Sequence, residues 1–577
     1  MKKWKRTTSV MAAAILAASA LLSGCSGGSD SAGGESSQAQ TAESQAGESQ
    51  AAAETTVGAA GVDPAVHDES RRIADGDVTL TIFCDFQNGA RAYYTDLGEN
   101  PVVQWIEEDT GLNLEFIHAP AGDDGSYFQQ MLASGDLPDL MFTNLFQSNY
   151  PGGVEGAIAD GLLYNVTELV ETEAVNFNAL CEESGDPDID KKIRGDEGNI
   201  IKFGTIWLPP TDNNKIFNGL IVRQDWLDKY GLEAPVTLDE YTEVLRTFKE
   251  NGVQVPLALC EFGQSQFYAN NPIASAFDVS IMDFDLDDEG NVHYSRTQDG
   301  YKEFLQVLRD WAAEGLIDTD FVSRTIDDSL KLFQNGTAGM CFAHTYNVKQ
   351  SLAAGPAVDP EFKLTALEMP KVNADDTTHM SGITSSINSQ SWQVSADTKY
   401  PEEAVKFIDY LMDPDIMLIT AWGTNLDVET YTEDENGTRS FSDFVNNNPD
   451  GLDYDTVRDL YMCEPFQIMY DETMEASQYS EEECHQSWDA WGKQNDNAHK
   501  LPSYLTLTTE ESQELTDIKT KLSNYSDEMV YRFIFGEEDL ESGWDGFVAQ
   551  LKDLGSERAE EIYKAAYDRY MARDTAE

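Results

Sequence analysis

The sequence has little positive charge and few cysteines, and each shortage excludes a class of protein. Lys and Arg together number 38 against 104 Asp and Glu, so the formal net charge is -66. An excess of negative charge this large disfavours nucleic acid and anionic membrane surfaces as partners. The seven cysteines include no C-x-x-C pair, so the sequence predicts neither a zinc ribbon nor a thiol redox motif.

The cysteines that remain after Cys25 are scattered singly along the chain. Their even number allows disulfides, which stays an open alternative. Strings such as Leu259-Cys260 and Met340-Cys341 place them among apolar neighbours, as is typical of core positions. We therefore expect most of them to be buried free thiols.

Strings for the common catalytic mechanisms are also missing. From residue 77 onward the sequence contains no G-x-S-x-G, H-E-x-x-H or P-loop string, which disfavours serine-nucleophile, zinc-hydrolase and nucleotide chemistry. We predict no catalytic residue, no metal ligand and no cofactor.

The first 24 residues have the pattern of a lipoprotein signal peptide. A basic start at Lys2, Lys3, Lys5 and Arg6 precedes the apolar stretch 10–20, which is too short for a stable transmembrane helix. It ends in Leu22-Ser23-Gly24-Cys25, the pattern of a bacterial lipobox. We expect cleavage before Cys25 and lipidation of its thiol, so that acyl chains hold the protein on the membrane.

Residues 25–76 are predicted to be a disordered tether. The stretch from Ser26 to about Val62 consists almost entirely of Ser, Gly, Ala, Gln, Glu and Thr and has no aromatic residue. Such a composition offers too little apolar surface to offset the entropy of ordering. The folded part is then residues 77–577.

The folded part opens with a predicted β-α-β unit. Residues 78–83 alternate like a strand, Asn100 and Pro101 suit the start of a helix, and residues 112–117 return as a strand. The pattern recurs around the strand 220–222 and a capping box that begins at Thr237. Two α/β lobes with largely parallel sheets are therefore expected.

Five strings along the folded part resemble the large extracellular solute-binding lipoproteins of ABC oligosaccharide importers (family 1 type). They are the segments 133–140, 225–232, 333–340 and 400–407, and 544–547 together with 561–569. The resemblance implies a type II periplasmic-binding-protein-like fold with a ligand cleft at a hinge that the chain crosses several times. By analogy, the first lobe takes about residues 77–206 and 383–422, and the second about 207–382 and 423–577.

The resemblance also implies a function and a location. The chain is expected to capture a carbohydrate by lobe closure and to deliver it to the permease subunits of an ABC transporter. It is expected to be a monomer on the outer face of a bacterial cell membrane of Gram-positive type, and not an enzyme. A peptide-binding importer subunit, a surface adhesin or sensor partner, and an extracellular glycoside hydrolase with a carboxylate pair remain alternatives. The identity of the sugar is left open.

Two acidic stretches suggest calcium only weakly. Asp283, Asp285 and Asp287 alternate, but the sixth and twelfth positions of an EF-hand counted from Asp283 hold Asp288 and Tyr294 instead of Gly and Glu. We interpret this stretch as a hairpin with a Glu-Gly-Asn turn. Residues 186–190 are interpreted in the same way, with calcium as an alternative because some relatives are said to bind it nearby.

Candidate ligand contacts are loop aromatics and amides, because sugars offer apolar faces and hydroxyl groups. Phe86 and Asn88 follow the first strand, and Asn144 follows the strand 140–142, at edges where open α/β sheets bind ligands. The remaining candidates lie at expected lobe crossings or in polar loops: Trp207, Gln264, Tyr268, Trp392 and Trp422. Trp422 also begins a string, 422–427, that departs from the usual family turn. Trp488 and Trp491 share a helical face, which favours core packing.

Overall fold

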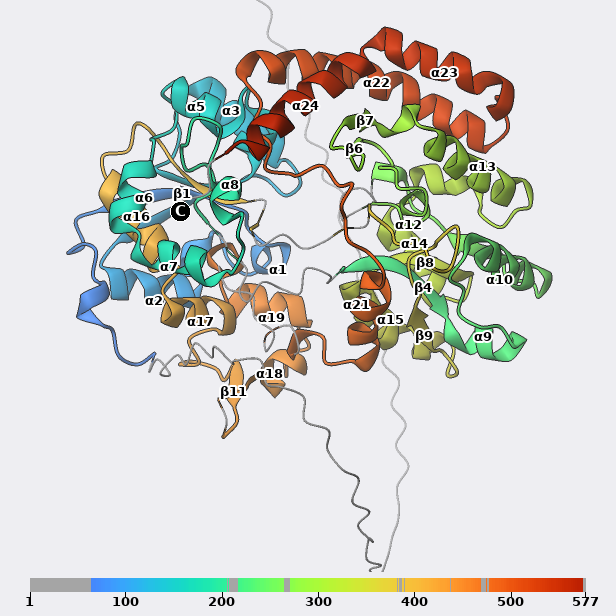
Figure 1. Ribbon diagram of the computed structural model, residues 1–577. Coiled ribbons are helices and arrows are strands. Elements are labelled where there is room, and N and C mark those ends of the chain that lie inside the picture. Colours follow the sequence, from blue (N-terminus) through green and yellow to red (C-terminus); the bar gives the residue numbers. More distant parts are fainter. Residues whose placement is uncertain are drawn as a thin grey trace, which may run out of the picture. The chain divides into compact units, whose positions relative to one another are not determined.

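The computed structural model describes most of the chain from residue 64 onward (Figure 1). The described residues are 64–204, 206, 216–263, 270–380, 382, 387–388, 390–435, 437–467, 474 and 477–573. The predicted signal peptide, the lipidation site Cys25 and the tether up to residue 63 lie outside them. So do three candidate ligand contacts, Trp207, Gln264 and Tyr268. Among the described residues, no helix is both long and apolar enough to span a bilayer.

The first lobe is built on a four-stranded sheet with the order β10-β3-β1-β2. Its strands are β1 (Thr79–Phe83), β2 (Asn113–Ile117), β3 (Leu140–Thr143) and β10 (Ser391–Val394). β1 pairs in parallel with β2 and β3, whereas β10 runs antiparallel to β3. The predicted β-α-β unit is therefore confirmed.

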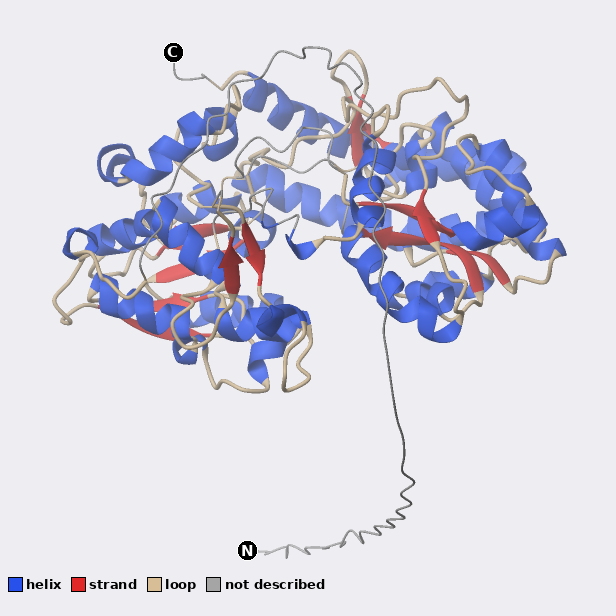
Figure 2. Ribbon diagram, turned by 90° about the horizontal axis from the view of Figure 1, so that it is seen from below, coloured by secondary structure: helices blue, strands red, loops and turns tan. Residues whose placement is uncertain are grey.

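Helices of the first lobe surround this sheet (Figures 1 and 2). From the first half of the chain they are α1 (Asn88–Arg91), α2 (Pro101–Thr110), α3 (Asp124–Ser134), α4 (Leu145–Asn149), α5 (Gly153–Ala159), α6 (Thr167–Glu173), α7 (Val175–Glu183) and α8 (Ile189–Ile193). Later segments add α16 (Pro401–Tyr410), α17 (Pro414–Trp422), α18 (Asp443–Asn446), α19 (Tyr454–Tyr461) and the hairpin of β11 (Tyr431–Glu433) and β12 (Arg439–Phe441).

The start of α2 forms as predicted. The Asn100 side chain accepts a hydrogen bond from the Val102 backbone N–H at 2.8 Å, and Pro101 occupies the first turn, where its missing N–H costs nothing. Gly111 ends the helix with a φ of 70°, a conformation that glycine adopts without a steric penalty. The buried Asn100 amide also donates to the Met462 carbonyl at 2.7 Å, which fixes a distant segment against α2.

That distant segment corrects the predicted lobe boundary at residue 422. Leu460, Cys463 and Phe466 are buried in the same hydrophobic core as β1 and α2, and α19 packs on α1 and α2. Residues from 423 to 466 thus pack with the first lobe, although we expected them in the second. The apolar face of α19, which carries Val457 and Leu460, predicts that the helix packs on a core, but periodicity does not indicate which lobe supplies that core.

Residues 64–76 are the second correction, because the prediction placed them in the tether. The Trp105 indole N–H donates to the Pro64 carbonyl at 2.8 Å, and Ile73 N–H donates to the Thr110 carbonyl at 2.8 Å. Arg71 adds an ion pair with Asp415 at 2.6 Å. Residues 64–76 therefore pack with the first lobe ahead of β1, held by backbone pairing that composition does not predict.

The second lobe is built on a sheet with the order β5-β8-β4-β9. Its strands are β4 (Asn218–Arg223), β5 (Val255–Ala258), β8 (Ala338–His344) and β9 (Leu364–Ala366), and a separate hairpin is formed by β6 (Phe284–Leu286) and β7 (Val292–Tyr294). Only β5 and β8 pair in parallel. The expected α/β lobe is present, with a mixed sheet.

Helices of the second lobe fall into two sets. Those among the strands are α9 (Gln224–Tyr230), α10 (Leu238–Glu250), α12 (Pro272–Ser275), α13 (Asp299–Ala313), α14 (Ile326–Gln334), α15 (Thr345–Val358) and α21 (Glu482–Gly492). The last three are α22 (Thr509–Ile534), α23 (Leu540–Leu554) and α24 (Ser556–Met571), which share a core with α13 and the β6-β7 hairpin. The capping box at Thr237 is present at the start of α10.

Core residues follow the predicted pattern at several further positions. Trp488 and Trp491 are buried in one cluster against β4 and β8, which confirms core packing. Five cysteines are buried and Cys181 is partly buried, all with free thiols. The stretch from Asp283 folds as the predicted hairpin, with the Asn291 N–H donating to the Asp287 carboxylate at 2.7 Å.

Candidate functional site

Two of the predicted amides lie at exposed ends of first-lobe strands. Asn88 begins α1 shortly after β1, and Asn144 directly follows β3; both side chains are exposed. β1 and β3 are parallel neighbours, so the two amides stand at the same edge of one sheet. Phe86 lies at this edge too, but its ring is buried.

The Phe86 ring is covered by two neighbours of the same lobe. Its centroid lies 4.5 Å from that of the stacked His118 ring, and the Arg91 guanidinium lies 5.0 Å over it. Arg91 also donates to the Phe86 carbonyl at 2.6 Å. Phe86 therefore supports the edge of the sheet and leaves no open ring face for a ligand in this conformation.

The tryptophans predicted to stack on ligand, Trp392 and Trp422, are buried in hydrophobic cores. Trp392 lies in β10 with its ring centroid 5.0 Å from that of Phe142 and 5.8 Å from that of Phe466. Trp422 ends α17, and its ring centroid lies 4.6 Å from that of Phe441. The serine-rich sequence of residues 385–395 predicts a loop at Trp392, whereas the structure places it in β10. The alternation that indicates a strand spans only four residues there, too few to detect.

Asp459 is a residue of this edge that sequence reasoning missed. It comes from α19, and its carboxylate accepts a hydrogen bond from the Gly89 N–H at 3.0 Å. A side chain at Gly89 would collide with it, because a Cβ there would lie 2.5 Å from the Asp459 oxygen. Burial, together with the nearby negative charge of Glu464, raises the pKa of Asp459 to about 7.

A cavity of about 470 Å³ lies beside elements of both lobes. The first lobe contributes Gln147, Ser148 and Gly153 from α4 and α5. The second contributes Asn270, the β6 strand, Met380 and α22, and the connecting segment 500–507 completes the wall. The lining combines apolar and aromatic side chains with amides, hydroxyls and three charged groups, a composition suited to a polar organic ligand.

Three predicted positions adjoin the cavity along the chain. Asn144 is followed directly by α4, which carries the lining residues Gln147 and Ser148. Asn270 lines the wall two residues after Tyr268, and Met380 lines it just before the serine-rich stretch. The segment 500–507 was not predicted as part of a site, because a short Leu-Pro-Ser string carries no signal of its own.

Some polar groups of the cavity lining have hydrogen-bond partners within the described part of the protein, and one buried oxygen has none there. The Asn270 amide donates to the Val279 carbonyl at 2.9 Å and accepts from the Ile281 N–H at 3.0 Å, so it braces the wall. The Gln147 amide donates to the Leu505 carbonyl at 3.2 Å. Its Oε1 is buried and has no hydrogen-bond partner among the described residues.

Lys519 and Asp283 form an ion pair in the wall. The Lys519 ammonium lies 3.2 Å from the Asp283 carboxylate and 3.4 Å from the Tyr563 hydroxyl. Burial opposes the lysine charge, but Asp283 and Tyr563 outweigh it and raise the pKa of Lys519 above its ordinary range. The Lys519 ammonium is therefore compensated locally by the Asp283 carboxylate.

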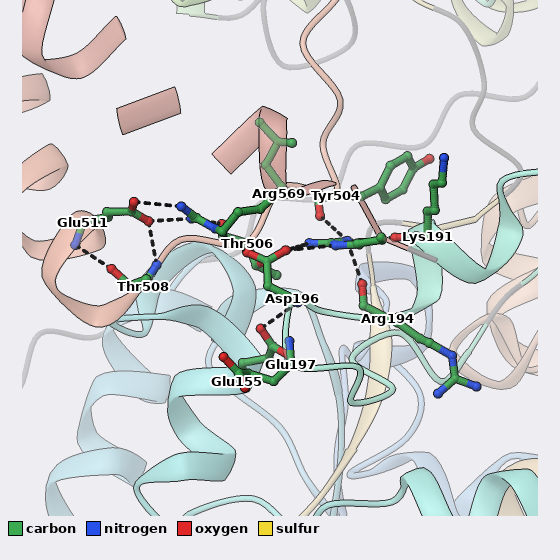
Figure 3. A network of polar contacts seen from close by, with 12 residues as sticks. Glu155, Lys191, Arg194, Asp196, Glu197, Tyr504, Thr506, Thr508, Glu511 and Arg569 are labelled. Carbon is green, nitrogen blue, oxygen red and sulfur yellow. Dashed lines mark hydrogen bonds and ion pairs between the residues drawn. The ribbon is translucent and has the colours of Figure 1, made fainter. Parts of the chain in front are cut away.

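A network of arginines and carboxylates lies near the connecting segment (Figure 3). Arg569 of α24 donates to Asp196 at 2.7 Å and to Glu511 at 2.6 Å and 2.9 Å. Arg573 donates to the same Asp196 carboxylate and to the Tyr504 carbonyl at 3.2 Å. Glu155 accepts from the backbone N–H groups of Asp196 and Glu197, so first-lobe and C-terminal residues share one set of polar contacts.

Metal binding finds no geometric support in the part of the chain that the structure describes. No three His, Cys, Asp or Glu side chains gather there as a ligand set. In the stretch 186–190, Asp186 pairs with Lys192, Asp188 lies 3.4 Å from Lys191 and Asp190 lies 3.2 Å from Arg194. Each carboxylate thus has a basic neighbour.

Comparison with known proteins supplies the family. Residues 91–417 match the family described as bacterial extracellular solute-binding protein. The fructooligosaccharide ABC transporter substrate-binding protein FusA of Streptococcus pneumoniae is 24% identical over 243 residues, which cover 39% of this chain and 43% of FusA. The melibiose/raffinose/stachyose-binding protein MelE of Bacillus subtilis is 23% identical over 262 residues, 42% of this chain and 54% of MelE. These matches span about half the length of each relative.

Solved structures agree with the fold. A human-milk-oligosaccharide (HMO) binding solute-binding protein of an ABC transporter from Bifidobacterium longum infantis has a TM-score of 0.69 at 18% identity, covering 86% of this chain and all of that one. The alginate-binding protein AlgQ2 has a TM-score of 0.67 at 21% identity, covering 87% of this chain and all of that one. The two-lobe, periplasmic-binding-protein-like fold is therefore confirmed, while identities this low carry no ligand assignment.

Proposed function

Since the chain belongs to the family of bacterial extracellular solute-binding proteins, we propose that it captures an oligosaccharide outside the cell and delivers it to the permease subunits of an ABC importer. The observation that carries this proposal is the cavity, whose wall combines first-lobe, second-lobe and connecting residues. A ligand held there contacts both lobes at once. Such contacts favour a closed form over an open one, because only the closed form makes all of them.

The lining supports a saccharide as the ligand. The aromatic rings of Phe284 and Tyr563 offer apolar surface, and the serine and threonine hydroxyls of the lining can hydrogen-bond with sugar hydroxyls. Named relatives bind fructooligosaccharides and raffinose-type sugars. We retain Asn88 and Asn144, with Trp207, Gln264 and Tyr268, as proposed ligand contacts. Phe86, Trp392 and Trp422 are proposed to act through packing.

The membrane attachment belongs to the same proposal. A lipid on Cys25 and a tether before residue 64 would hold a monomeric binding unit at the outer face of the membrane, within reach of the permease. Binding and release suffice for this role, and no bond of the ligand is broken. The named relatives are likewise described as binding proteins.

Thermal-shift screening tests the proposed ligand class. The compact unit Ala59–Glu577 is heated with neutral oligosaccharides, acidic oligosaccharides and short peptides in parallel. A ligand at 100 times its dissociation constant stabilises the native state by about 2.7 kcal/mol, which raises the melting temperature measurably. Stabilisation by saccharides alone supports the proposal, stabilisation by peptides alone replaces it with peptide import, and hydrolysis of any bound glycan excludes it.

A further inference from the structure

Lys500 differs from the other charged residues of the cavity. The residue lines the cavity, and its ammonium has no hydrogen bond or ion pair with any described residue. The other two charged lining groups, Asp283 and Lys519, neutralise each other at 3.2 Å. The lining therefore carries one uncompensated positive charge in a chain with a net charge of -66.

The backbone holds Lys500 firmly in this place. Residues 499 and 500 run beside β6: Leu286 N–H donates to the His499 carbonyl at 2.8 Å, and Lys500 forms an antiparallel bridge with Asp285. Lys500 N–H also donates to the Asn497 carbonyl at 3.1 Å. The ammonium is thus presented from an ordered strand-like segment.

Nearby carboxylates are occupied elsewhere. Asp285 accepts from Gln298 at 2.5 Å and from Ser295, and Asp288 accepts from the His499 ring at 3.1 Å. Neither is part of the cavity lining. Lys500 therefore has no carboxylate partner in the described part of the chain, although the protein is rich in carboxylates. Its charge is available to a ligand that enters the cavity.

The Lys500 side chain is accessible to a ligand. The residue is exposed to solvent, while desolvation by the surrounding protein lowers its pKa. An anion that reaches the ammonium can form a charge-assisted hydrogen bond, which is about twice as strong as a neutral one.

We propose that Lys500 determines specificity by binding an anionic substituent, a carboxylate or sulfate, on the saccharide ligand. The inference rests on the proposed function and narrows its ligand class to acidic oligosaccharides. The Lys500 ammonium contacts the anion, while the hydroxyl groups and aromatic rings of the lining contact the hydroxyl groups and apolar faces of the sugar. The net charge of -66 disfavours large polyanions as partners of the chain as a whole, but the local charge at Lys500 is positive.

Calorimetric titration of matched ligands tests Lys500. The probes are oligouronides, their neutral methyl esters and sulfated oligosaccharides, added to Ala59–Glu577. We expect the wild type to bind an acidic probe at least tenfold more tightly than its neutral counterpart. Lys500→Gln should abolish this preference, Lys500→Arg should retain it, and Lys500→Glu should reverse it. The preferred acidic probe identifies carboxylate or sulfate as the anion.

A matched control separates the local charge from the global one. Lys331, exposed on α14 with 69% of its side chain accessible, lies outside the lining, so Lys331→Gln makes the same change in net charge and should leave the preference intact. Equal binding of acidic and neutral probes by the wild type, or an unchanged preference in Lys500→Gln, overturns the inference while the proposed function stands. Failure of every saccharide to bind overturns both.

Discussion

Arg573 and Asp196 connect the C-terminal end of the chain to the first lobe through two short contacts. The Arg573 Nε and Nη2 atoms lie 2.9 Å and 2.7 Å from one Asp196 carboxylate oxygen. The same guanidinium donates to the backbone carbonyls of Lys191 and Arg194 at 2.7 Å and 2.6 Å. Only 6% of the Arg573 side chain is accessible, so water screens this arrangement little.

Removal of Arg573 should therefore be costly. Arg573→Ala leaves the Asp196 charge and three backbone carbonyls short of a donor, and breaking a buried pair in this way costs on the order of 3 kcal/mol. Arg558→Ala serves as the control, because its pair with Glu514 is nearly half exposed on both sides and such pairs contribute about 0–1 kcal/mol. Urea unfolding measures both; equal losses would show that Arg573 has no special role.

The raised pKa of Asp459 predicts a pH dependence. Burial raises its folded-state pKa to about 7 from an ordinary 3.8, so its protonated form contributes stability that is complete below about pH 4 and is lost as the pH rises through 7. Asp459→Asn mimics the protonated form. We expect the variant to gain melting temperature over the wild type at pH 8 and much less at pH 5.

A pH-independent difference between Asp459→Asn and the wild type would contradict this account. Asp455, Arg458 and Glu464 also act on Asp459, so the titration is best followed directly by NMR of a carbon-13-labelled aspartate. A midpoint near pH 4 would show that the carboxyl group is hydrated.

Trp392 and Asn144 should respond to substitution in opposite ways. Trp392 is 2% exposed among aromatic neighbours, so Trp392→Ala should cost about 3–5 kcal/mol of stability through the cavity it leaves. Asn144 is exposed at the end of β3, so Asn144→Ala should leave the melting temperature nearly unchanged and weaken saccharide binding. Scanning calorimetry measures the stability of both variants, and titration calorimetry measures their affinity for saccharide. A stable Trp392→Ala protein with weakened binding would restore the predicted stacking role of Trp392.

Much of the fold could be predicted because its signals are local. Asn100, Pro101 and Gly111 specify both ends of α2, and Thr237 with Glu240 specifies the start of α10. The sheet edge of Asn88 and Asn144 followed from the rule that parallel strands end together. These features depend on residues a few positions apart, so a single sequence is enough to predict them.

The missed features depend on contacts between distant segments. Asp459 reaches Gly89 across 370 positions, and Arg573 reaches Asp196 across 377. Nothing in either local string indicates its partner. Trp392 was assigned to a loop because serine-rich neighbours hide a strand whose hydrogen bonds come from β3 and Phe203. Pairing between distant segments determines which aromatic side chains are buried, and hence which remain available to a ligand.

Small-angle X-ray scattering with and without ligand tests the central claim most directly. The unit Ala59–Glu577 is measured free and with the oligosaccharide that stabilises it most in the thermal screen. Lobe closure on the ligand predicts a smaller radius of gyration in the complex and a change that saturates at one ligand per chain. An unchanged radius of gyration under saturating, calorimetrically verified binding would contradict capture by closure.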